Sequence, residues 1–121
     1  MELKKLKQDF AICKLANRDN VDFTGEYIFL CKTDDEISLV CEAARVPTGA
    51  IVVEPGWKGL KIAGVLDFGM VGVIAKISNI LAQAGISVFV VSTYNTDYIF
   101  VKAENYEKCV NELVCNGYVV E

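Results

Sequence analysis

The 121-residue chain contains no histidine and only two prolines. Without histidine it lacks the commonest general base, the usual serine and cysteine triads, and most transition-metal sites. A zinc site would need four closely spaced cysteines, and the five cysteines are scattered without a Cys-x-x-Cys pair. We therefore expect free thiols in a reducing cytoplasm, no bound metal, no cofactor and no enzymatic activity.

The chain also lacks an excess of positive charge and any long apolar run. Its formal net charge is −4, and no basic stripe is present. This argues against a nucleic-acid partner and against an anionic membrane surface. The first ten residues, MELKKLKQDF, have no apolar core of a secretion signal, and no run approaches the roughly 20 residues that span a bilayer. We expect a cytoplasmic protein, and a hydrophobic content of 53% indicates that it buries a core.

The C-terminal half of the chain has a clear alternation of elements. Apolar residues recur with helical spacing over 70–84 and 104–116, the second with Val114 expected to face inward. Gly85 follows the first helix at the position where helices often end. Short apolar or β-branched segments predict strands at 59–65, 86–93, 98–103 and 118–121. The resulting order, β-α-β-β-α-β, is that of a ferredoxin-like unit.

The N-terminal half reads as a reduced copy of this unit. At an offset of 60, Gly25, Phe29 and Thr33 match Gly85, Phe89 and Thr93; after one inserted residue, Leu39 and Val40 match Phe100 and Val101. A first strand is predicted at 10–16, another strand within 47–57, and short helices at 17–23 and 41–46. We expect a degenerate unit over 1–57 and a complete one over 58–121, packed together because each is small.

The segment LDFGMVGVIAKISNILAQAGISVFVVST, residues 66–93, resembles the signature of ACT domains, which regulate enzymes by binding amino acids. The whole chain is similar to small tandem-ACT proteins, to the regulatory domains of aspartokinases and to CASTOR-type arginine sensors. The segments that carry this closer resemblance are TDDEISLV (33–40), GW followed by LKI (56–62), LDF…GV (66–73) and STYNTDYIFV (92–101). Unlike many ACT loops, this one has no proline after its acid. The resemblance implies an α+β fold of two tandem βαββαβ units with antiparallel sheets, the first with reduced helices.

The start of helix 70–84 is the candidate binding site. A helix N-terminus offers free N–H groups to a carboxylate, and glycines let a ligand approach the backbone. Carboxylates at the site would serve the ammonium group of an amino acid. The resemblance places the ligand between ACT units and adds residues from the hairpin. The candidate ligand-binding residues are Asp67, Phe68, Gly69, Met70, Val71, Gly72, Val73, Ser92, Thr93 and Asp97.

Three of these residues also have a purely structural interpretation. Asp67 is also suited to cap the helix, Asp97 to form the turn, and Gly72 to admit a close neighbour. We also expect the end of strand 86–93 to lie away from the start of helix 70–84. A complete site would then need the other repeat or a neighbouring subunit.

The sequence thus predicts a regulatory module that binds an amino acid at an interface between ACT units and signals through association. The expected assembly is a homodimer with a possible further protein partner, and the acidic balance slightly favours a cationic amino acid. The alternative is a structural or protein-interaction module without a functional amino-acid site.

Overall fold

The computed structural model describes residues 1–66 and 71–121. These residues form two compact units: unit 1 consists of Met1–Lys7 and Lys58–Glu121, and unit 2 of Gln8–Trp57. Two long strands, β1 (Glu2–Leu15) and β4 (Ala50–Ile62), contribute residues to both units. The strands are hydrogen-bonded in the order β2-β3-β1-β4-β6-β5, and β7 pairs with β1. The predicted α+β fold of two ACT-type units, the first with reduced helices, is confirmed.

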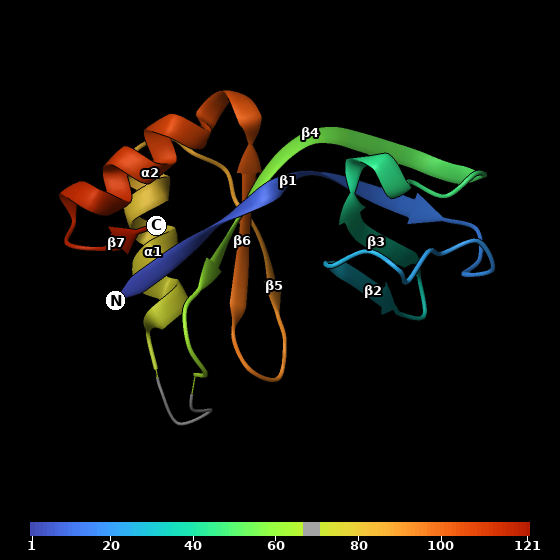
Figure 1. The fold of residues 1–121 in the computed structure, drawn as a ribbon, viewed down its shortest axis with the longest axis horizontal. Coiled ribbons are helices and arrows are strands. Elements are labelled where there is room, and N and C mark those ends of the chain that lie inside the picture. Colours follow the sequence, from blue (N-terminus) through green and yellow to red (C-terminus); the bar gives the residue numbers. More distant parts are fainter. Residues whose placement is uncertain (67–70) are drawn as a thin grey trace. The chain divides into compact units, whose positions relative to one another are not determined.

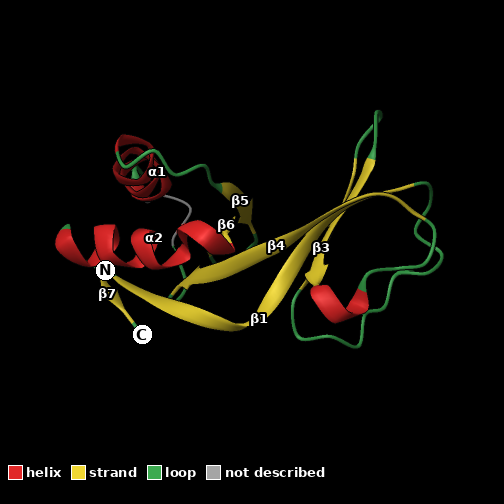
Figure 2. Cartoon of the chain, turned by 90° about the horizontal axis from the view of Figure 1, so that it is seen from above, coloured by secondary structure: helices red, strands yellow, loops and turns green. Residues whose placement is uncertain are grey.

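Unit 1 contains both α-helices of the described chain, and they lie on one face of its strands (Figures 1 and 2). Its elements after β4 are α1 (Val73–Gln83), β5 (Phe89–Ser92), β6 (Asp97–Lys102), the 3₁₀ turn η2 (Ala103–Asn105), α2 (Tyr106–Cys115) and β7 (Val119–Val120). The described part of the predicted helix 70–84 is therefore found within one or two residues of its expected bounds. The expected helix 104–116 begins later, because η2 occupies its first residues.

The core of unit 1 is built from the apolar stripes of the two helices and the facing strand positions. Ile77 and Leu81 of α1 and Cys109 and Leu113 of α2 are fully buried. They pack on strand side chains that include Leu3, Leu60, Ile62, Ile99 and Val101. The expectation for Val114 is wrong, since its side chain is 52% exposed. Successive helix residues point about 100° apart, so Val114 lies beyond the stripe that Cys109 and Leu113 define.

Unit 2 has the same strands with almost no helix. It contains β2 (Ile28–Lys32), β3 (Ile37–Glu42) and the 3₁₀ turn η1 (Ala43–Arg45), which is all that remains of the predicted helix 41–46. The predicted helix 17–23 is wrong, because this segment belongs to the loop between β1 and β2. Side chains there compete with a helix for the backbone: Asn17 Oδ1 accepts from Asp19 N, and Asp22 Oδ1 accepts from Thr24 N.

The β2–β3 and β5–β6 hairpins pair their strands in the same register, so neither has an extra residue relative to the other. Phe29 pairs with Val40 in unit 2, and Phe89 pairs with Phe100 in unit 1, so the offset is 60 on both strands. The expected match of Leu39 and Val40 to Phe100 and Val101 is therefore wrong by one residue. Both turns are closed by the same bond, from Thr33 N to Glu36 O and from Thr93 N to Thr96 O, each 2.9 Å.

Strands β1 and β4 are much longer than the sequence predicts. The predicted strand 10–16 covers only the end of β1, which stops at Leu15. The predicted strand 59–65 begins with the last four residues of β4 but continues past its end at Ile62. The strand expected within 47–57 is part of the same β4. The start of β1 pairs in parallel with β7, Leu3 lying opposite Val120, whereas β1–β3, β2–β3 and β5–β6 are antiparallel. Pairing with a strand more than 100 residues away leaves no local pattern in the sequence MELKKLKQ.

Candidate functional site

A cavity of about 330 Å³ lies in unit 1 between the first turn of α1 and the turn that joins β5 to β6. The two lining segments are Gly72–Ala75 and Ser92–Asp97, and Leu66 completes the lining. Five predicted site residues are thus brought together: Gly72, Val73, Ser92, Thr93 and Asp97.

Other predicted site residues lie elsewhere. Val71 is 91% exposed and lines a separate cavity of about 250 Å³ on the side of Lys76 and Tyr118. The predictions for Asp67, Phe68, Gly69 and Met70 fall on the segment 67–70, outside the described residues.

The expectation that the end of strand 86–93 lies away from the start of the helix is wrong. Ser92 at the end of β5 and Gly72 at the start of α1 line the same cavity within unit 1. The connection from α1 to β5 is short, so the strand runs back along the helix and ends near its beginning. The helix N-terminus and the hairpin turn therefore meet without a second unit.

The first turn of α1 lies at this cavity. Gly72 is the N-cap residue, and Lys76 N donates to Gly72 O at 2.9 Å. The N–H groups of Val73, Ile74 and Ala75 have no carbonyl acceptor within the helix, since an α-helix leaves its first N–H groups unsatisfied. Their alignment gives this end a partial positive charge. The site is therefore suited to an anion such as a carboxylate.

Gly72 is required for its conformation, and close packing does not explain it. Its φ is 79°, in the left-handed region that residues with a Cβ rarely adopt. A Cβ added there would meet no described atom within 4 Å. The suggestion that Gly72 admits a tightly packed neighbour therefore finds no support among the described residues.

The opposite wall of the cavity is a hairpin turn held by hydrogen bonds. Thr96, only 3% exposed, donates from its hydroxyl to Ile62 O at the end of β4, at 2.8 Å. Thr93 Oγ1 donates to Thr96 O at 3.0 Å, and Leu66 N donates to Asn95 O at 2.7 Å. These bonds connect the turn to β4 and to the loop that follows it.

Asp97 supplies negative charge on that wall. It is the one charged residue among the described residues that line the cavity. The sequence indicated Asp97 as a site residue but not its neighbours Tyr94, Asn95 and Thr96, which also line the cavity. Their position directly between Thr93 and Asp97 was the signal that could have included them. The cavity thus combines a donor-rich helix end with a carboxylate.

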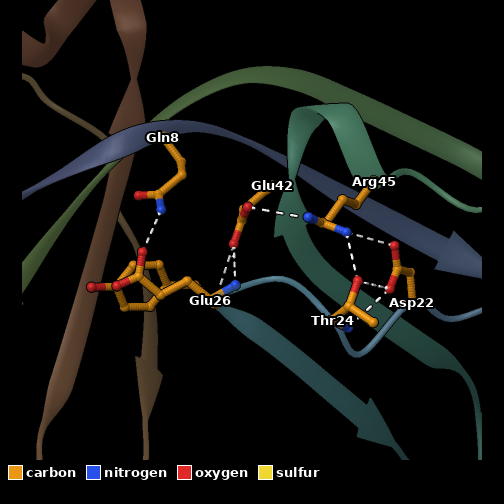
Figure 3. Close-up of polar contacts among 7 residues, drawn as sticks. Gln8, Asp22, Thr24, Glu26, Glu42 and Arg45 are labelled. Atoms are coloured by element: carbon orange, nitrogen blue, oxygen red, sulfur yellow. Dashed lines mark hydrogen bonds and ion pairs between the residues drawn. The ribbon is translucent and has the colours of Figure 1, made fainter.

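A second polar cluster lies in unit 2 and has a structural role (Figure 3). Arg45 Nη1 contacts Asp22 Oδ2 at 2.7 Å and Thr24 Oγ1 at 2.8 Å. Hydrogen bonds from the hydroxyl and backbone N–H of Thr24, together with Arg45, lower the pKa of Asp22 to about 2. Glu42 Oε2 accepts from the backbone N–H groups of Glu26 and Tyr27, at 2.7 and 2.9 Å. The cluster ties the loop before β2 to the end of β3.

The cysteines form no comparable site. All five are free thiols; Cys13, Cys41 and Cys109 are buried, whereas Cys31 and Cys115 are exposed. Burial raises the pKa of Cys41 to about 12 and that of Cys109 to about 11, so both thiols stay protonated and unreactive at neutral pH. Among the described residues, no group of three or more cysteine, aspartate or glutamate side chains could hold a metal ion. None of the described helices is both long and apolar enough to cross a membrane.

Comparisons with known proteins agree with this architecture. A family model of the ACT domain matches residues 52–114. The structure resembles a crystal structure of an Agrobacterium tumefaciens protein, with 31% identity and a TM-score of 0.88 over 99% of this chain and 91% of that one. A Vibrio cholerae protein of unknown function, a possible transport protein, has 21% identity and a TM-score of 0.74 over 92% and 85% of the two chains.

The regulatory subunit of aspartate kinase from Thermus thermophilus shares the fold at 11% identity, with a TM-score of 0.62 over 93% of this chain and 95% of that one. No curated protein sequence matches the chain. The family match over more than half of the residues, together with the Agrobacterium relative, shows that this chain belongs to the ACT-domain family.

Proposed function

We propose that this protein is a regulatory module that binds a free amino acid in the unit 1 cavity. The observation that carries the proposal is the meeting of the α1 N-terminus and Asp97 at one cavity. A zwitterionic amino acid carries a carboxylate and an ammonium group a few ångströms apart. The N–H groups of Val73, Ile74 and Ala75, which have no acceptor within the helix, suit the carboxylate, and the Asp97 carboxylate suits the ammonium group.

The surroundings of the cavity support a site that is completed by association. Val65, Tyr94 and Val71 are 73%, 80% and 91% exposed, and each lines the cavity or adjoins a residue that does. Large exposed apolar side chains beside a cavity are typical of surfaces that bind another protein or a ligand. We propose that a second copy of the chain covers them in a homodimer and that ligand occupancy changes this association, or that with a protein partner.

The division of labour between the units is part of the proposal. Residues 58–121 would act as the ligand-binding ACT domain and residues 1–57 as a degenerate ACT unit without the helix that forms one wall of the cavity. The net charge of −4 favours a cationic amino acid such as arginine or lysine. We further propose a cytoplasmic, non-catalytic role that needs no cofactor.

A thermal-shift screen against the twenty amino acids tests the binding step. A ligand at 100 times its dissociation constant stabilises the folded protein by about 2.7 kcal/mol, which raises the melting temperature by several degrees. We expect a shift with one amino acid or a few related ones. Light scattering in the same samples follows the oligomeric mass.

A pair of matched variants locates the binding site. Asp97→Asn should abolish the shift, because it removes the charge opposite the helix N-terminus. Asp35→Asn, in the equivalent turn of unit 2, should leave the shift intact. A full shift in Asp97→Asn would contradict the site. No shift with any amino acid, beside a stable dimer, would favour the interaction module without a functional amino-acid site.

A further inference from the structure

Unit 2 holds two buried thiols that the proposed function does not use. Cys13 of β1 and Cys41 of β3 are each only 2% exposed. Both belong to one apolar cluster, together with Ala11, Leu15 and Leu39. Because successive side chains of a strand alternate between faces, these five side chains point to the same face of the sheet. The two thiols therefore share one environment that is poor in water.

The strand register brings the two thiols together. In the antiparallel pair of β1 with β3, Ala11 lies opposite Cys41 and Cys13 lies opposite Leu39. Cys13 and Cys41 are thus diagonal neighbours on one face, where side chains of adjacent strands interact. Their thiols are hydrogen-bonded to each other. The two sulfur atoms therefore meet without any shift of one strand along the other.

The surroundings make the two thiols unequal. Burial raises the pKa of Cys13, but the hydrogen bond with Cys41 acts in the opposite direction. For Cys41, burial, the charge of a Cys13 thiolate and the hydrogen bond all act upward, and its pKa is about 12. Cys13 is therefore the thiol that more readily becomes a thiolate, and Cys41 is the one that keeps its proton.

A small cavity lies beside the cluster that holds this pair. Its volume is about 90 Å³, and its lining includes Leu15 of the cluster and Ala50, which packs against the cluster. The polar residues Asn17, Asn20 and Thr48 also line it. About 10–15 Å³ is enough to hold one water molecule, so a molecule as small as hydrogen peroxide fits. Bulky thiol reagents are much larger and would not enter.

We propose that Cys13 and Cys41 form a redox-sensitive pair, which hydrogen peroxide converts to a disulfide between β1 and β3. The Cys13 thiolate attacks one peroxide oxygen, the O–O bond breaks, and the leaving hydroxide takes up the proton that Cys13 lost. The products are one water molecule and a sulfenic acid on Cys13.

Cys41 completes the reaction. Its sulfur attacks the Cys13 sulfur, the S–O bond breaks, and the Cys41 proton leaves with the hydroxyl group as a second water molecule. Two thiols thus lose two electrons, and one peroxide is reduced to two water molecules. Although Cys41 is protonated, it reacts because the sulfenic acid forms beside it.

The disulfide acts as a reversible lock on unit 2. Strands β1 and β3 are already paired, so the cross-link preserves their arrangement. It also closes the chain from Cys13 to Cys41, including β2, into a covalent loop. Such a loop restricts the unfolded chain, so the oxidised protein should melt several degrees higher, and a thiol reductant should reverse this. The inference does not depend on amino-acid binding.

Alkylation followed by mass spectrometry tests the proposal. A Cys31→Ser, Cys115→Ser background removes both exposed thiols and leaves Cys13, Cys41 and Cys109. The folded protein is treated with hydrogen peroxide, unfolded in guanidinium and alkylated with iodoacetamide. We expect one alkylated thiol, that of Cys109, and a proteolytic fragment in which Cys13 is linked to Cys41. Dithiothreitol should restore three alkylated thiols.

Two variants in the same background serve as matched controls. Cys13→Ala should keep Cys41 and Cys109 open to alkylation, and peroxide should not change its melting temperature. Cys41→Ala should accumulate the sulfenic acid on Cys13, which dimedone labels. The measurement on the background protein uses neither variant, so it still tests the proposal if a variant fails to fold.

Three results would overturn the proposal. The first is that all three thiols stay open to alkylation under peroxide that oxidises the unfolded protein. The second is that Cys109, buried in the core of unit 1, is lost as fast as the pair. The third is that dimedone labels Cys41 in Cys13→Ala but not Cys13 in Cys41→Ala. Because none of these measurements uses an amino acid, they can fail while the thermal-shift screen succeeds, and the reverse also holds.

Discussion

Glu42 connects two parts of unit 2 through backbone hydrogen bonds, and its removal should be costly. Its side chain is 14% exposed at the end of β3. One carboxylate oxygen accepts from Glu26 N and Tyr27 N, and the other lies 3.5 Å from Arg45 Nε. Glu42→Leu keeps a side chain of similar size but leaves these donors without their acceptor. The backbone N–H groups of Glu26 and Tyr27, in the loop before β2, would then have to donate to water instead.

The expected loss of stability follows from these bonds. A hydrogen bond to a charged group contributes about 1.5–3 kcal/mol to stability. The two N–H groups share one oxygen and lie close to solvent, so water recovers part of the loss. We therefore expect a decrease of about 2 kcal/mol in the free energy of unfolding. For a chain of this length, that corresponds to a melting temperature lower by about 8 °C.

Urea unfolding followed by circular dichroism measures this change, with Glu36→Leu as the matched control. Glu36 lies in an exposed turn, where its backbone carbonyl accepts from Thr33 N and its backbone N–H donates to Thr33 Oγ1, so the substitution leaves both bonds possible. We expect Glu36→Leu to stay within about 0.5 kcal/mol of the parent, as surface substitutions usually do. The reasoning fails if Glu42→Leu is equally mild or if both variants lose the same amount.

Three further predictions concern other parts of the chain. The pKa of Asp22 is about 2 in the folded protein, below its ordinary 3.8, so its stabilising contribution should be lost as the pH falls from about 4 to 2. The acid-unfolding curve of Asp22→Asn should therefore lack the loss of stability that Asp22 protonation causes. A curve identical to that of the parent would contradict the lowered pKa of Asp22. Gly72→Ala should destabilise the protein by about 1 kcal/mol, because alanine is strained at a φ of 79°, and a melting temperature equal to that of the parent would disprove this. In native protein, Ellman's reagent should titrate two fast thiols, Cys31 and Cys115, and the other three only after unfolding; a third fast thiol would show that the burial is incomplete.

Features with a local pattern could be predicted from the sequence. The spacing of Ile77 and Leu81 indicated the buried stripe of α1, and the β-branched segments indicated the strands of the hairpin. Gly72 was a candidate because a glycine at a helix start has few explanations. These signals are short-range, since each depends on residues within one or two turns of one another.

Features that depend on distant contacts could not be predicted in the same way. The first residues of β1 pair with β7 at the other end of the chain, and nothing in MELKKLKQ marks a strand. The hairpin offset was misjudged because similar apolar residues at neighbouring positions, such as Phe100 and Val101, allow two alignments. The cavity within unit 1 was not predicted. The short connection from α1 to β5 makes the strand run back along the helix, so the end of β5 lies near the start of α1 and both line one cavity.

The two equivalent hairpin turns bear on the kinetics of ligand binding. In unit 2, Thr33 Oγ1 accepts from Asp35 N and Glu36 N, and the turn closes as its counterpart does, although no α-helix of that unit stands beside it. The turn shape therefore comes from its own residues and does not need a neighbouring helix or a ligand. A ligand entering between α1 and Thr93–Thr96 would meet a wall that is already formed. Its association rate would then be set by diffusion and desolvation, with no slow step in which the turn has to order.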